Sequence, residues 1–138
     1  MFFKRLAHVC LNVKNLQRSL DYYRKLGFVD RFQFTSKGRD FGRYLEIADK
    51  TFIELFEYPN KGPAQNSGLA HFCLETEDMD GLMAHLSAQG VAYTPKKQGA
   101  DFTWQIWLDD PDGNKFEVHQ YTEKSMQQHG GVVEANWA

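Results

Sequence analysis

Two histidines and two glutamates recur at one fixed spacing along this 138-residue chain, and their side chains could together bind a metal ion. His71 follows His8 by 63 residues, and Glu117 follows Glu54 by the same 63 residues. Imidazole nitrogens and carboxylate oxygens suit divalent ions such as Zn, Ni, Co, Fe or Mn. A buried carboxylate without a cationic partner is strongly disfavoured, so a cation would also balance charge. The spacing predicts one divalent ion bound by these four residues.

An internal duplication accounts for this spacing. The hexapeptide LAHVCL at residues 6–11 recurs as LAHFCL at residues 69–74, and the same offset carries Gly27 onto Gly90. Taken singly, a strand histidine is usually a core or surface residue, and a strand glutamate is usually solvated or paired with Lys or Arg. The duplication argues against that reading, because the offset keeps both residue types in register.

The first repeat has the pattern of a strand, a helix and three further strands. Apolar and polar residues alternate from Ala7 to Val13, which predicts a strand. Asn15 can cap a helix in which apolar residues recur at helical spacing, and Gly27 lies where that helix would end. Three further strands are predicted over residues 30–35, 43–47 and 52–58.

The second repeat predicts the same order of elements. Asp78 is the helix cap and Gly90 the stop, followed by strands over residues 92–94, 103–108 and 115–121. The sequence DDPDGN at residues 109–114 predicts a turn between the last two strands. The fold class is therefore α+β, with two tandem βαβββ modules whose mixed sheets form a cup. We expect a single domain over residues 1–138, with module one at 4–59, a linker at 60–68, module two at 69–121 and a tail at 122–138 without clear periodicity.

The period of two places the chemically active side chains on the sheet faces away from the helices. The predicted lining of a substrate pocket is Asn12, Phe56, Tyr58, Trp107 and His119. His119 lies two residues, or about 6.8 Å of strand, beyond Glu117, so we expect it outside the ligand set. Cys10 and Cys73 are interpreted as free thiols that pack as small buried hydrophobic residues.

Composition and charge argue against nucleic acid and membranes as binding partners. A formal net charge of -2 and a pI near 6.2 give no electrostatic footprint for nucleic acid. No apolar run approaches the roughly 18 residues of a membrane span, and the start of the chain does not resemble a signal peptide. We expect a cytoplasmic protein with a small-molecule substrate, no nucleic-acid partner and no membrane partner.

Five ordered motifs resemble those of the vicinal-oxygen-chelate superfamily, which includes glyoxalase I, bleomycin-binding proteins and extradiol dioxygenases. They are LAHV at 6–9, LQRSLDYY at 16–23, FIEL at 52–55, AHF at 70–72 and DPDGNKFE at 110–117, and the resemblance covers residues 4–121. The ligand order His, Glu, His, Glu is most similar to glyoxalase I, the lactoylglutathione lyase.

This resemblance implies a metal-dependent lyase or isomerase that acts on a small α-hydroxy-carbonyl or thiohemiacetal substrate through a metal-stabilised enediolate. It also implies one divalent ion per chain, with Ni, Co or Zn favoured and Mn or Fe compatible. Glu117 is the favoured catalytic base, and Glu54 can share that role.

Two positions depart from bacterial glyoxalase I. Asn12 and Tyr58 occupy the places of an arginine and an asparagine that serve glutathione there, so the glutathione site is not carried over. The alternatives are an extradiol-type ring-cleaving dioxygenase, with His119 as its acid–base histidine, and a binding protein that sequesters a drug or metabolite. A homodimer is expected, because two βαβββ modules per chain leave sheet edges and because each superfamily cup needs two modules side by side, from one chain or from two.

Overall fold

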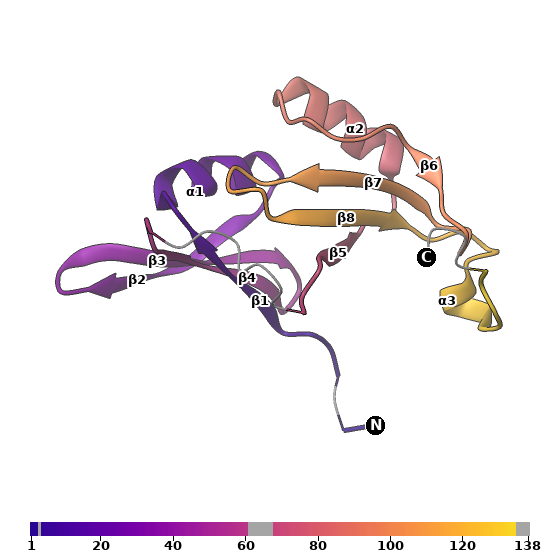
Figure 1. The fold of residues 1–138 in the computed structure, drawn as a ribbon, viewed down its shortest axis with the longest axis horizontal. Coiled ribbons are helices and arrows are strands. Elements are labelled where there is room, and N and C mark those ends of the chain that lie inside the picture. The colour runs from indigo at the N-terminus through magenta and orange to yellow at the C-terminus, as the bar shows by residue number, and fades with distance from the viewer. Residues whose placement is uncertain (3, 61–67, 135–138) are drawn as a thin grey trace. The chain divides into compact units, whose positions relative to one another are not determined.

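The computed structural model describes residues 1–2, 4–60 and 68–134. The chain divides into two compact units (Figure 1). Unit 1 comprises Met1–Gly68 with Asp110–Asn114, and unit 2 comprises Leu69–Asp109 with Lys115–Ala138. Each unit contains one four-stranded mixed sheet and a helix of ten residues. The predicted α+β class with two βαβββ modules is confirmed.

Unit 1 follows the predicted order of elements. They are β1 (His8–Val13), α1 (Leu16–Lys25), β2 (Val29–Ser36), β3 (Arg39–Ala48) and β4 (Thr51–Glu57), with strand order β1-β4-β3-β2. The side chain of Asn15 accepts a hydrogen bond from the Arg18 N–H and caps α1 as predicted. Gly27 ends the helix with a φ of 95°, a conformation that favours glycine.

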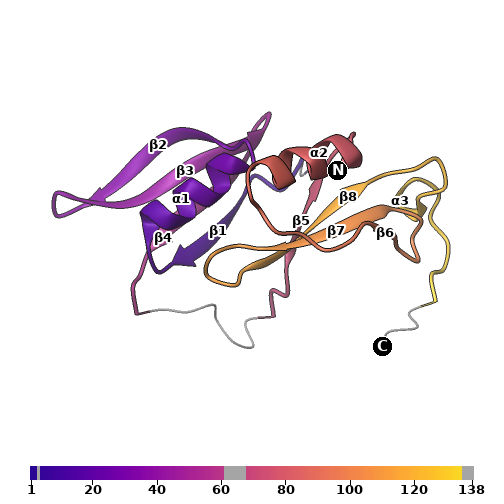
Figure 2. The ribbon, with the colours of Figure 1, turned by 90° about the horizontal axis from the view of Figure 1, so that it is seen from above.

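The core of unit 1 lies between α1 and one face of its sheet (Figure 2). Leu20 and Tyr23 of the helix are buried, as are Leu45, Ile53 and Leu55 of β3 and β4. Because side chains alternate along a strand, burial of Ile53 and Leu55 directs Glu54 to the opposite face.

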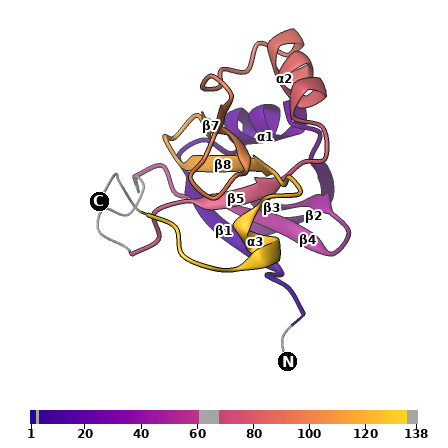
Figure 3. The ribbon, with the colours of Figure 1, turned by 90° about the vertical axis from the view of Figure 1, so that its right-hand side faces the viewer.

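Unit 2 repeats this plan. Its elements are β5 (Phe72–Glu75), α2 (Met79–Ala88), β6 (Lys97–Gln98), β7 (Trp104–Asp109), β8 (Lys115–Gln120) and α3 (Met126–His129), with strand order β5-β8-β7-β6. Figure 3 shows α2 on one side of β7 and β8 and α3 on the other.

The duplication extends to hydrogen bonds that start the two ten-residue helices. Asp78 caps α2 by accepting from the Gly81 N–H, the counterpart of the Asn15 cap on α1. Gln120 accepts from the Met79 N–H just as Glu57 accepts from the Leu16 N–H. Both pairs are related by the 63-residue offset, so the repeat preserves how the last strand of each module holds its helix.

Three expectations need correction or qualification. The strand predicted at residues 92–94 is absent, and β6 forms later, at Lys97–Gln98. At Thr94 the hydroxyl, not the backbone carbonyl, accepts from the Trp107 N–H, and the following Pro95 has no N–H to continue a ladder. Most of the predicted linker, residues 61–67, lies outside the described residues.

The predicted tail is not without structure. Its first part folds onto unit 2, where the Met126 N–H donates to the Asp101 carbonyl and the Gln127 amide donates to the Asp101 carboxylate. Of the helices that the structure describes, none is long and apolar enough to cross a membrane.

The predicted turn between β7 and β8 is held by residues of α1. Asp110 is 4% exposed and accepts a hydrogen bond from the Tyr23 hydroxyl at 2.9 Å, while backbone N–H groups of Asp112 and Asn114 donate to its other oxygen. Arg18 of α1 forms an ion pair of 2.7 Å with Asp112. Burial, together with the nearby Asp110 carboxylate, raises the pKa of Tyr23 well above its usual value. The turn therefore belongs to the packing of unit 1.

We expect Tyr23→Phe to lower the free energy of unfolding by about 1–3 kcal/mol, because the buried Asp110 carboxylate loses one of its hydrogen-bond donors. Chemical denaturation measures the change as a lower midpoint. Tyr93→Phe is the matched control, since it removes an exposed hydroxyl hydrogen-bonded to Ser87 and should shift stability by about 0.5 kcal/mol or less. Equal midpoints for the two variants would refute the role of Tyr23.

Candidate metal centre

The first histidine–glutamate pair lies on the face of the unit 1 sheet away from α1. His8 begins β1, and Glu54 lies on β4, opposite Cys10 in the parallel register. The His8 Nε2 atom is 3.7 Å from a Glu54 carboxylate oxygen. The Glu54 side chain is 17% exposed, so its charge is only partly solvated. The strand alternation thus brings together the two predicted ligands of module one.

Tyr44 is a further residue of this half-site that the sequence analysis did not identify. It lies opposite Glu54 on β3, and its hydroxyl shares a hydrogen bond of 3.1 Å with His8 Nδ1. With Nδ1 engaged, Nε2 is the ring nitrogen that faces Glu54 and is available to an ion. The repeat could have revealed Tyr44, because it precedes the predicted pocket residue Trp107 by 63 residues.

We expect Tyr44→Phe to weaken metal binding about 10- to 100-fold, since an outer partner of a ligand histidine fixes the ring's tautomer and orientation. Calorimetric titration with Ni²⁺ or Co²⁺ measures the affinity. Tyr58→Phe is the control, because Tyr58 is an aromatic residue of the same module whose ring packs edge-on against Phe41. If both variants bind the ion as tightly as the parent, the Tyr44 hydroxyl does not orient His8.

The second pair lies in unit 2 and repeats the geometry of the first. His71 immediately precedes β5, and its Nε2 atom is 3.5 Å from a carboxylate oxygen of Glu117 on β8. The Trp107 ring meets His71 edge-on at 4.7 Å between centroids, as Tyr44 meets His8 at 5.7 Å. Trp107 is opposite Glu117 in the β7–β8 register. Each module therefore combines a histidine, a glutamate and an aromatic ring.

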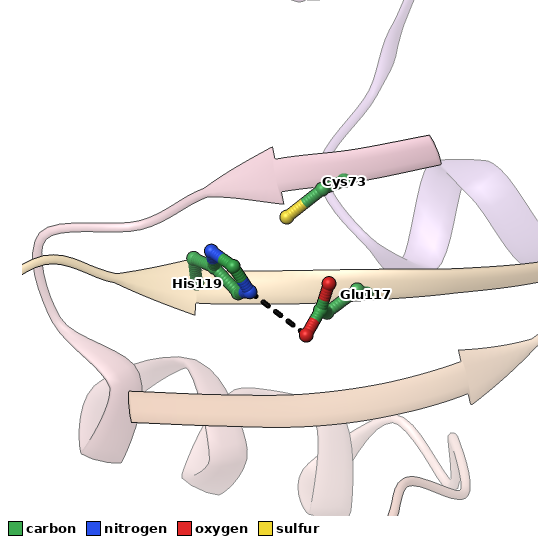
Figure 4. A group of neighbouring side chains, drawn as sticks. All are labelled: Cys73, Glu117 and His119. Carbon is green, nitrogen blue, oxygen red and sulfur yellow. Dashed lines mark ion pairs between the residues drawn. The ribbon is translucent and has the colours of Figure 1, made fainter. Parts of the chain in front are cut away.

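His119 lies closer to Glu117 than the sequence spacing suggested. Its Nε2 atom is 2.8 Å from Glu117 Oε1, and Figure 4 shows the two side chains turned toward each other on β8. The spacing of two residues gives the separation along the backbone only. The side chains of Glu117 and His119 turn toward each other, so their ends meet although their backbone positions are apart. His119 therefore belongs with the potential ligands as well as with the predicted pocket lining.

The interpretation of the cysteines as buried hydrophobic residues is wrong. Cys10 and Cys73 are both exposed free thiols, on the sheet faces that carry Glu54 and Glu117. Although each residue as a whole reaches solvent, its sulfur is partly desolvated. This desolvation, reinforced by Glu54, raises the pKa of Cys10 to about 11. The same effect, reinforced by Glu117, raises that of Cys73 to about 12. Both thiols are therefore protonated at neutral pH when no cation is bound.

The donor set fits a divalent ion. The Glu117 side chain is only 9% exposed, and unpaired buried charge is strongly disfavoured. Among the described residues, the ion-pair partners of Glu54 and Glu117 are histidines, and neither carboxylate has the Lys or Arg partner of the alternative reading. In each module the imidazole and the carboxylate are ligand types that a borderline divalent metal accepts.

The remaining predicted pocket residues extend the same faces. Asn12 is exposed on β1 opposite Phe56, and Phe56 stacks on Phe41 at 5.2 Å. Further ring contacts on this sheet join Phe32 to Tyr44 at 4.6 Å and Tyr44 to Phe52 at 4.9 Å. Phe34 joins the two groups, because its ring contacts Phe32 at 5.1 Å and Phe56 at 4.9 Å. The rings thus form a continuous series, and none of those named in this paragraph is fully buried.

Two βαβββ modules, each with a histidine–glutamate pair on the sheet face away from its helix, define the class of this protein as a duplicated-module α+β fold. The family model of the Glyoxalase/Bleomycin resistance protein/Dioxygenase superfamily matches residues 5–118 of this chain. The chain therefore belongs to this superfamily. The resemblance noted in the sequence is thereby confirmed at the level of the superfamily.

Similar proteins include enzymes of different chemistry. The chain is 27% identical over 134 residues to a trivalent organoarsenical cleaving enzyme of Bacillus sp. (strain MD1), covering 91% of this chain and 78% of that protein. A glyoxalase family protein from Enterococcus faecalis superposes with a TM-score of 0.74 at 25% identity, covering 86% of this chain and 99% of the other. The lactoylglutathione lyase of Agrobacterium tumefaciens gives 0.65 at 18% identity, with coverages of 90% and 97%, and shares the fold.

Proposed function

We propose that this protein is a metal-dependent lyase or isomerase of the glyoxalase I type, acting on a small α-hydroxy-carbonyl or thiohemiacetal substrate. The observation that carries the proposal is the repeated histidine–glutamate pair, at 3.7 Å in module one and 3.5 Å in module two. His8, Glu54, His71 and Glu117 would hold one ion, with Ni, Co or Zn favoured. When bound, the ion supplies a Lewis acid for a substrate oxygen.

Glu117 is the proposed base. In this role its carboxylate takes a proton from the carbon beside the substrate carbonyl, and Glu54 is the second carboxylate able to carry a proton. His119 Nε2 lies 2.8 Å from one Glu117 oxygen and His71 Nε2 lies 3.5 Å from the other, so an imidazole flanks each oxygen. His119 is thus a positioning residue for Glu117. The low exposure of Glu117 keeps bulk water from competing for the proton.

We propose that the substrate carries an apolar or aromatic group. The series of rings on β3 and β4, with Phe32 half-exposed beside them, offers a surface that such a group would cover. Asn12 and Tyr58, in place of the residues that serve glutathione in bacterial glyoxalase I, favour a thiol other than glutathione. Free thiols at Cys10 and Cys73 fit the proposed cytoplasmic location, where thiols stay reduced.

A second candidate function is cleavage of a trivalent organoarsenical. The relative from Bacillus sp. (strain MD1) carries that name, and both exposed thiols of this chain lie opposite a proposed ligand glutamate. Trivalent arsenic prefers sulfur ligands, in keeping with the softness of thiolates.

A three-arm screen of the metal-loaded protein distinguishes these chemistries. One arm offers thiohemiacetals of a 2-oxoaldehyde with glutathione or with a small aromatic thiol, and the others offer a catechol in air with Fe(II) or a trivalent phenylarsenical. We expect turnover in the first arm, at least as fast with the aromatic thiol as with glutathione. Turnover confined to the catechol arm, or release of inorganic arsenic alone, would replace the proposal with the corresponding alternative.

A further inference from the structure

A second group of potential ligands lies entirely within unit 2. Cys73 is opposite Glu117 in the parallel β5–β8 register, and His119 is two residues beyond Glu117 on the same strand. One donor atom from each of the three lies within 4.8 Å of the other two, and Figure 4 shows sulfur, carboxylate and imidazole gathered on the same face of the sheet. Neither His8 nor His71 belongs to this group.

One polar atom of the group, His119 Nε2, lacks a hydrogen-bond partner among the described residues. The Glu117 and His119 side chains are 9% and 13% exposed, and buried His119 Nε2 makes no hydrogen bond of acceptable geometry with the described residues. Its 2.8 Å approach to Glu117 is a close ion-pair contact. The His119 nitrogen thus lies beside a carboxylate oxygen, away from water and without a hydrogen bond, and a cation between the two would be a partner for both.

Module one provides an internal comparison. Cys10 is opposite Glu54 just as Cys73 is opposite Glu117, so the duplication repeats the thiol–carboxylate pair. Phe56 occupies the position equivalent to His119, so module one lacks the third donor. Both modules therefore have the thiol–carboxylate pair, and only module two adds a histidine to it.

We propose that Cys73, Glu117 and His119 form a binding site for a thiophilic divalent cation such as Zn²⁺, Co²⁺ or Cd²⁺, contained in module two alone. Sulfur, nitrogen and oxygen donors bind zinc at roughly 2.0–2.3 Å, so three ligands of a tetrahedral ion lie about 3.3–3.6 Å apart. The present spacing needs only side-chain movement to reach this. Binding forms a metal–sulfur bond, and the thiol proton leaves to solvent.

The site shares Glu117 with the proposed catalytic centre, which rests on the proposed function. Binding at the site does not depend on that centre. An ion bound by Cys73 and His119 would draw Glu117 from its role as base, so a thiophilic cation would inhibit the proposed reaction. Binding itself stands whether or not His8 and His71 hold another ion, and the test therefore uses spectra in place of activity.

Co²⁺ titration of the full chain tests the proposal. We expect the near-ultraviolet charge-transfer band of a cobalt–thiolate bond in the parent, in His8→Ala and in the matched control Cys10→Ser. Cys73→Ser should lose the band, and His119→Phe, which copies the module-one residue, should lose most of it. Retention of the band in Cys73→Ser, or no band in the parent, overturns the site. Loss in Cys10→Ser with retention in Cys73→Ser would instead assign the sulfur ligation to module one.

A second measurement guards against variants that fail to fold. In Cys10→Ser, Cys73 is the remaining thiol, and its alkylation rate can be followed with and without Zn²⁺. We expect Zn²⁺ to change the alkylation rate at least about tenfold, because binding replaces the thiol proton with the ion and engages one lone pair of the sulfur. Replacing His119 with Phe in this background should remove most of this change. Equal rates with and without Zn²⁺ contradict the site.

Discussion

Glu117→Gln is expected to slow proton exchange beside the substrate carbonyl by about 10²–10⁴-fold while the protein keeps most of its metal affinity. Gln offers an amide oxygen to an ion at the same place on β8, but it cannot accept a proton, so ligation and base function separate. NMR gives the exchange rate, either as uptake of deuterium by the substrate in deuterated water or as its loss from a deuterated substrate in ordinary water. Calorimetric titration gives the metal affinity.

Glu57→Gln is the matched control for this substitution. Glu57 lies on β4 and accepts from the Leu16 N–H, outside the proposed site. Its variant should exchange protons at the rate of the parent. If Glu117→Gln exchanges as fast as the parent while holding the ion, Glu117 is only a ligand and the base lies at Glu54 or His119.

His71→Ala is expected to weaken metal binding by more than about 100-fold. The substitution removes one of four proposed ligands, and even the outer partners of a ligand are worth about 10- to 100-fold. His85→Ala on α2 is the matched control, because His85 is an exposed histidine of the same unit. Titration with Ni²⁺ measures the affinities of the two variants for comparison with the parent. Binding by His71→Ala that equals that of His85→Ala would remove His71 from the site.

Mixing the His8→Ala and His71→Ala variants addresses how modules combine. If each centre takes module one from one chain and module two from another, as the expected homodimer allows, a mixed dimer contains one intact set of four ligands. Tight binding then returns after subunits exchange. If the four ligands come from one chain, the mixture binds no better than either variant.

The internal repeat made much of the fold predictable. The caps Asn15 and Asp78, and the stop at Gly27, lie as expected because each depends on local backbone chemistry. Strand alternation likewise placed Glu54 and Glu117 on the correct faces, since burial of Ile53 and Val118 fixes their neighbours. These features need only a short stretch of sequence and a period.

The features that could not be predicted depend on side-chain rotation and long-range packing. The approach of His119 to Glu117 needs knowledge of both side-chain conformations, and the Tyr44–His8 hydrogen bond joins residues 36 positions apart. The Tyr23–Asp110 hydrogen bond spans 87 positions, so no local pattern marks it. The late start of β6 follows from one hydroxyl, that of Thr94, replacing a backbone acceptor.

The exposure of Cys10 and Cys73 was misjudged for a related reason. Free cysteine is usually buried, and that tendency outweighed the strand alternation that placed both thiols on the polar faces. The register confirms this placement, with each thiol opposite a glutamate. For these two cysteines, strand alternation predicts the exposure of the side chain better than residue type does.

Metal stoichiometry tests the central claim most directly. The Cys73→Ser variant lacks the proposed thiolate site and leaves His8, Glu54, His71 and Glu117 intact. Elemental analysis after loading with Ni²⁺ and removal of excess metal should give one ion per chain, and adding His8→Ala to this background should abolish it. A Cys73→Ser protein that holds no Ni, Co, Zn, Mn or Fe(II) after incubation, or an equal ion content with and without His8, would contradict the four-ligand centre.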